Sequence, residues 1–145
     1  MAITQAICNS FKQELLEGDH NFDTGGDVFK LALYTSSATL NSATTSFTTT
    51  NEVANSGQYT SGGGDLTGQN TSIASGVAIV DFANLSFTGV TLTARGALIY
   101  NTSSAVTNAA VAVLDFGADK TATSGTFTVQ FPAFTTAAAI LRISG

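Results

Sequence analysis

Charged residues are scarce in this 145-residue chain: they make up 10% of it, whereas typical globular domains contain about 25%. Five Lys and Arg against ten Asp and Glu leave a formal net charge of −5 at pH 7. So few basic residues argue against a phosphate-binding groove, because affinity for nucleic acid begins with Lys and Arg. Nucleic acid is therefore not an expected partner.

The residues of most catalytic and metal sites are equally rare, since the chain has one Cys, one His and no Trp. Cys8 has no partner for an intrachain disulfide. One Cys and one His cannot fill the three or four ligand positions of a zinc site. A serine triad would need His20 as its base, and no Gly-x-Ser-x-Gly segment accompanies it. We therefore expect no cofactor and no catalytic residue, and we predict that the protein is not an enzyme.

Long apolar runs are also missing. No run reaches the roughly 18 residues of a transmembrane helix, so a membrane is not an expected partner. No basic stretch followed by an apolar one marks a signal peptide. At this length we expect a single domain over residues 1–145.

The first 18 residues carry the clearest helix signal. Large apolar side chains recur there at every fourth position, namely at Ile3, Ile7, Phe11 and Leu15. This spacing predicts one apolar stripe on a helix. Thr4 is a suitable N-cap and Gly18 a suitable left-handed stop. We predict a short N-terminal helix over residues 1–18.

From residue 28 onwards the apolar period changes to two, which is typical of strands. Strands are expected at 28–34, 77–82, 91–100, 110–116, 126–131 and 139–143, with weaker candidates at 65–73 and 85–87. Turn signals separate them, including Gly117–Lys120. Short strands in this series predict an all-β antiparallel sandwich over 28–145, with a jelly roll as one form of it. The polar tract at about 35–64 is an extended arm, a loop, or a region of hidden short strands.

An acidic segment follows the predicted helix. Asp19, Asn21 and Asp23 match the first three ligand positions of a calcium loop. Thr24 stands where that loop needs Gly, and Lys30 where it needs a bidentate Glu. These departures favour a solvated acidic turn over a calcium site, and no metal site is predicted.

Six segments spread over the chain carry a further signal: 1–18, 29–40, 49–53, 94–101, 112–120 and 125–132. The first reads MAITQAICNSFKQELLEG and the fourth ARGALIYN. Together they resemble small virion structural proteins of tailed bacteriophages. The resemblance implies a capsid cement, or decoration, protein, which is made in the host cytoplasm and stabilises the assembled capsid lattice from its outer surface. The partners implied are the major capsid protein and further copies of the chain, as a dimer or trimer.

Two other functions remain open. A tail-tip, adaptor or fibre component of the virion would share the same β-rich character. A carbohydrate- or calcium-binding module is a third interpretation.

Two segments are candidates for contact with neighbouring subunits. One is the N-terminal apolar stripe, and the other is the polar tract 35–64, whose large apolar residues include Leu40 and Phe47. The alternatives are that the stripe covers an open end of its own sandwich and that the tract is a surface loop.

Overall fold

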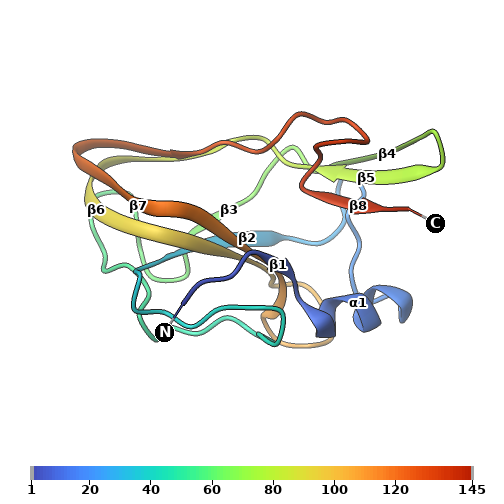
Figure 1. The fold of residues 1–145 in the computed structure, drawn as a ribbon, viewed down its shortest axis with the longest axis horizontal. Helices are drawn as coiled ribbons and strands as arrows, with labels where there is room; N and C mark the ends of the chain where they lie inside the picture. The colour runs from blue at the N-terminus through green and yellow to red at the C-terminus, as the bar shows by residue number, and fades with distance from the viewer. Residues whose placement is uncertain (1, 145) are drawn as a thin grey trace.

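Residues 2–144 are described by a computed structural model, in which they form one helix and eight strands (Figure 1). The helix, α1, spans Asn9–Leu16. The strands are β1 (Ala6–Ile7), β2 (Phe29–Tyr34), β3 (Gly64–Asp65), β4 (Asn70–Ala74), β5 (Val77–Asp81), β6 (Leu85–Asn101), β7 (Ala109–Val129) and β8 (Leu141–Ile143). They build a five-stranded sheet in the order β1-β7-β6-β2-β3 and a three-stranded sheet in the order β4-β5-β8, with every pairing antiparallel. The predicted all-β sandwich with one short helix is confirmed.

The two longest strands, β6 and β7, form a bent hairpin that takes part in both layers. In Figure 1 the start of β6 and the end of β7 lie in the upper layer with β5 and β8, and the rest of the hairpin lies in the lower layer. The pairing register shifts at four places, the first between Phe87 and Val90. Such shifts mark β-bulges, which bend a strand and increase its twist. The hairpin can therefore fold over the core without being interrupted.

The prediction of two separate strands at 110–116 and 126–131 is wrong, since β7 runs through both. Gly117, in the segment predicted as a turn, has a φ of 81°. Ser124 also has a positive φ, of 46°. These residues serve the irregularities of a long strand, which use the same backbone conformations as a turn.

The predicted start of the N-terminal helix is also wrong. α1 begins at Asn9, and the residues before it are extended because their backbone bonds to other segments. Ala6 and Ile7 pair with Val113 and Ala112 of β7, and the Thr4 N–H donates to the Leu40 carbonyl at 2.9 Å. The end of the helix agrees with the prediction, since Gly18 follows it with a φ of 82°.

Segment 35–64 is neither an extended arm nor a free loop: it packs on the chain's own sheets. Isolated bridges join Tyr34 to Glu52 and Ser46 to Ala109. Leu40 and Tyr59 are fully buried. Of the three alternatives for this segment, the structure shows the third, in which it contains short backbone pairings.

The carboxylate of Glu52 organises the second half of this segment. It accepts hydrogen bonds from the Tyr59 hydroxyl at 2.7 Å, the Ser61 hydroxyl at 2.8 Å and the Gly62 N–H at 2.7 Å. Gly63 follows with a φ of 81°, and a Cβ there would lie 1.8 Å from the Leu31 carbonyl oxygen. Only glycine permits this approach of the segment to β2.

Aromatic side chains fill the centre of the fold. Phe22 and Phe29 stack with their ring centroids 4.4 Å apart, and Phe82 meets Phe29 at 5.8 Å. All three are buried. Each fully buried side chain of this size contributes about 1.5–3 kcal/mol, so the cluster is a main source of stability.

Candidate functional site

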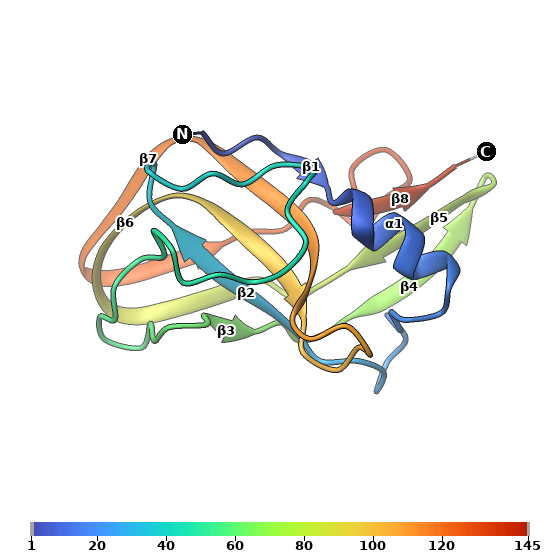
Figure 2. The ribbon, with the colours of Figure 1, turned by 90° about the horizontal axis from the view of Figure 1, so that it is seen from below.

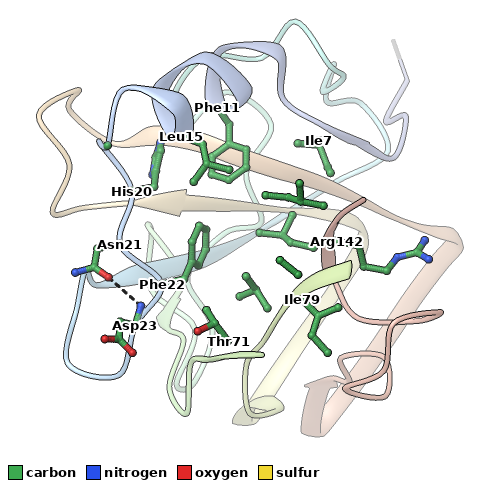
Figure 3. Close-up of a pocket in the computed structure, with 15 residues that line it drawn as sticks. Ile7, Phe11, Leu15, His20, Asn21, Phe22, Asp23, Thr71, Ile79 and Arg142 are labelled. Carbon is green, nitrogen blue, oxygen red and sulfur yellow. Dashed lines mark hydrogen bonds between the residues drawn. The ribbon is translucent and has the colours of Figure 1, made fainter. Parts of the chain in front are cut away.

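A cleft of about 540 Å³ lies between α1 and the three-stranded sheet. Figures 1 and 2 show α1 opposite β4, β5 and β8 at the same end of the molecule. Figure 3 shows the lining side chains, which come from β1, α1, the turn after α1 and all three strands. The cleft is therefore built from both ends of the chain and its middle.

The sheet side of the cleft is apolar because of strand alternation. Val80 pairs with Leu141, and Ala78 pairs with Ile143, so these four side chains share one face. On the opposite side, Phe11 and Leu15 project from α1, and Ile7 and Phe22 flank them. The arrangement offers a concave apolar surface.

Exposed apolar side chains lie on the elements that form the cleft. Leu16 of α1 is 90% exposed, Ile73 of β4 is 73% exposed and Ile143 of β8 is 58% exposed. Ile73 pairs with Ala78 and lies on the same sheet face as Ile143, and Leu16 follows Leu15 of the lining. We call these three residues the apolar rim. Within residues 2–144 five large apolar side chains are exposed, so the rim holds most of them.

Charges stand only at the margins of the cleft. Asp23 borders it from the turn after α1 and Arg142 from β8. Figure 3 shows the Arg142 guanidinium directed away from the cleft, and its Nη1 lies 3.4 Å from the Thr136 carbonyl oxygen. Neither residue pairs with a charge within the described chain. An apolar ligand surface fits the cleft better than a charged one.

The six predicted contact residues have different places in the fold. Ile3, Phe11 and Leu40 are buried in the core, so they are not free to bind a neighbour, although one side of Phe11 reaches the cleft. Phe47 is partly buried and stacks on Tyr100 with a centroid distance of 4.7 Å. Ile7 and Leu15 line the cleft. For Ile3, Phe11 and Leu40 the structure therefore shows the alternative, packing within the chain's own fold, and for Phe47 only the packing against Tyr100 is seen.

The acidic turn after α1 uses its polar side chains to hold its own backbone. Asn21 Oδ1 accepts the Asp23 N–H at 3.0 Å, which Figure 3 marks, and Asp23 Oδ1 accepts the Thr24 N–H at 2.9 Å. Asp27 Oδ2 accepts the Asn21 N–H at 3.0 Å. Within residues 2–144 no group of three or more His, Cys, Asp or Glu is placed to hold a metal ion, and Asp19 joins no such group. The Asp23 and Asp27 carboxylates thus cap backbone N–H groups of this turn.

A buried polar network beneath the cleft fixes the position of His20. Asn101 Oδ1 accepts the Ser103 N–H at 2.7 Å, and Asn101 Nδ2 donates to Asp27 Oδ2 at 2.8 Å. These two bonds set the orientation of the amide, so it is Nδ2 that meets His20 Nδ1 at 2.9 Å. His20 Nδ1 is then an acceptor, and its Nε2–H donates to Glu14 Oε1 at 2.9 Å. Both ring nitrogens are engaged, so the His20 imidazole links α1 to β6 and has none free for a substrate.

Comparisons with known protein families, with curated proteins and with solved structures gave no match.

The Cys8 thiol is buried and unreactive at neutral pH. Burial, and secondarily the Glu14 carboxylate, raise the pKa of the Cys8 thiol to about 11, so the thiol stays protonated at neutral pH. Cys8 is fully buried beside α1. Within residues 2–144, no helix has the length and apolar character needed to cross a membrane.

Sequence reasoning missed the apolar rim and the sheet side of the cleft. Ile73 is the one large apolar residue in 70–75, and a single such side chain does not show which way a strand faces. Ile143 and Leu141 belong to a strand that was expected, but nothing local indicates that it pairs with β5.

Proposed function

We propose that the protein is a non-enzymatic structural subunit of a phage virion, which binds the assembled capsid lattice as a cement protein. The observation that carries the proposal is the open apolar cleft together with the apolar rim on the elements that form it, on a chain in which charges are scarce. The resemblance of the six segments to phage virion proteins supplies the biological setting. In this role the cleft receives an apolar segment of the major capsid protein.

The energetics favour a repeated contact of moderate strength. Burying Leu16, Ile73 and Ile143 completely would contribute about 1.5–3 kcal/mol each, less what their partial burial already gives. Part of this is lost to the entropy of association. A lattice presents many equivalent sites, and a subunit that engages two of them gains affinity through its effective concentration.

The chemistry of the described residues supports a binding role. The one His has both ring nitrogens hydrogen-bonded, and the one Cys is buried with its thiol protonated. The cleft holds neither a nucleophile paired with a base nor a pair of facing carboxylates among the residues that line it.

The experiment measures binding of the purified protein to capsids that lack it. Leu16→Glu and Ile143→Glu place a charge on the rim, and Val106→Glu is the matched control, since Val106 is 40% exposed but lies outside the cleft. We expect the rim variants to bind about tenfold more weakly or worse, which corresponds to about 1.4 kcal/mol or more, and the control to bind normally. Capsids without the protein should also lose resistance to heat.

Three outcomes would overturn the proposal. The first is unchanged binding by both rim variants. The second is equal heat resistance of complete and deficient capsids. The third is a location on the tail, with few copies per virion instead of a number close to that of the major capsid protein; this would favour the tail-tip, adaptor or fibre role.

A further inference from the structure

Strand β4 is uncharged and, with five residues, is the longest of the four strands that end the two sheets. Within the described chain, β4 pairs only with β5, and all five of its residues are exposed. The other end strands, β1 and β3, have two residues each, and β8 has three. The middle residue of β8 is Arg142, whose charge would face its own copy in a symmetric pairing. Natural sheets protect their edges by shortness or charge, and β4 has neither.

The type of the turn between β4 and β5 shows which N–H and C=O groups of β4 do not bond to β5. Ser75 and Gly76 have φ values of 52° and 76°, and Ala74 pairs with Val77 across them. Two positive φ values in a two-residue loop define a type I′ turn, in which the flanking residues form a hydrogen-bonded pair. Hydrogen-bonded and non-hydrogen-bonded pairs then alternate along the hairpin. Asn70, Ser72 and Ala74 therefore bond to β5, while Thr71 and Ile73 direct their N–H and C=O groups away from it.

These free groups are self-complementary. In an antiparallel pairing of two β4 strands about a two-fold axis at Ser72, Thr71 of each copy lies opposite Ile73 of the other. Both residues have outward N–H and C=O groups, so the two pairs exchange four hydrogen bonds. No charge lies opposite a like charge, because β4 carries none.

We propose that two copies of the chain join along β4 to form one six-stranded sheet, in the order β8-β5-β4-β4-β5-β8. Paired residues of an antiparallel sheet share a face, so Ile73 of each copy packs beside Thr71 of the other. Both clefts then open on the same side of the joined sheet, because Thr71 and Ile73 lie on the face that lines the cleft. In this arrangement the free edge of β4 in each copy is paired with that of the other copy, so no β4 edge is left to bind a third chain and the assembly is a closed dimer.

Two proline substitutions test the pairing. Ile73→Pro removes an N–H that points away from β5, so we expect the monomer fold and its melting temperature to be nearly unchanged while dimerisation weakens at least tenfold. Ser72→Pro is the matched contrast: it removes an N–H that bonds to β5, so we expect it to lower the melting temperature. Sedimentation of the wild-type chain over a concentration series should show twice the 14.8 kDa mass of one chain.

Amide hydrogen exchange of the wild-type chain gives a second measurement that does not depend on the folding of any variant. The Thr71 and Ile73 amides should exchange slowly at high concentration and rapidly on dilution, while the Ser72 amide stays protected throughout. A wild-type monomer at all concentrations, a mass of three chains, or a dimer unaffected by Ile73→Pro would overturn the pairing. Capsid binding is tested separately by the Leu16 and Ile143 variants, which leave β4 unchanged.

Discussion

The Tyr59 hydroxyl joins segment 35–64 to β2, and its removal should weaken the fold strongly. The hydroxyl donates to Glu52 Oε2 at 2.7 Å and accepts the N–H of Leu33 at 2.8 Å. Tyr59→Phe keeps the ring, which meets Phe87 edge-on at 5.0 Å, so no cavity forms. It leaves the Leu33 N–H buried without a partner and takes one of three hydrogen bonds from the Glu52 carboxylate.

The expected cost follows from these two losses. An unsatisfied buried N–H costs about 1–3 kcal/mol, and a hydrogen bond to a charged group is worth about 1.5–3 kcal/mol. Because the two losses share one hydroxyl they do not add fully, and we expect about 2–4 kcal/mol in the free energy of unfolding. For a chain of this length that lowers the melting temperature by about 6–12 °C.

The assay is urea and thermal unfolding followed by circular dichroism, with Tyr34→Phe as the matched control. The Tyr34 hydroxyl donates one bond, to the Thr48 carbonyl at 2.6 Å, so its loss should cost about 1 kcal/mol. If Tyr59→Phe cost no more than Tyr34→Phe, then Glu52 and Tyr59 would not hold the segment on the sheet. A double-mutant cycle with Glu52→Gln should give a coupling energy of about 1 kcal/mol or more.

Two further predictions concern the polar network and alkaline pH. Asn101→Ala leaves His20, Asp27 and the Ser103 N–H without their partner in the network, so we expect the free energy of unfolding to fall by about 3 kcal/mol and the imidazole NMR signals of His20 to shift; unchanged signals would refute the assigned hydrogen bond. Burial raises the pKa of Tyr100 to about 12 and also raises that of Tyr34 and Tyr59, so between about pH 10 and pH 12 only the unfolded chain loses these protons. Stability should therefore be complete below about pH 10 and fall by about 1.4 kcal/mol per pH unit for each such tyrosine above it, measured by urea midpoints; Tyr100→Phe should reduce this slope, and an equal slope would contradict the assignment.

The sequence predicted best those elements whose pattern is local. The alternating run 28–34 became β2, and 77–82 became β5, each within one residue of its expected ends. The start of α1 could not be predicted, because Ile3 and Ile7 satisfy a helical spacing and an extended segment equally well. Pairing with Ala112 and Val113, over a hundred residues away, decides between the two.

The cleft shows the same limit. The sequence places Ile7 and Leu15 on an apolar stripe but does not show what the stripe packs against. In the structure both residues line the cleft. The strands that face them come from residues far apart in the chain, and their register decides which side chains face inward. A shift of one residue in β8 would replace Leu141 and Ile143 by Arg142 on that face. The local sequence does not contain this register.

The topology also sets the order in which the chain can fold as it is synthesised. Sheet partners of the first 34 residues lie far downstream: β1 needs β7, and β2 needs β3 and β6. About a hundred residues are synthesised between Ala6 and its partner Val113, which takes roughly 5–20 s at the usual rate of translation. The apolar run Phe29–Tyr34 likewise lacks its main partner until residues 96–101 of β6 have been made. The five-stranded sheet therefore cannot be completed until β7 has been made, and β2 is an unpaired apolar strand for much of synthesis.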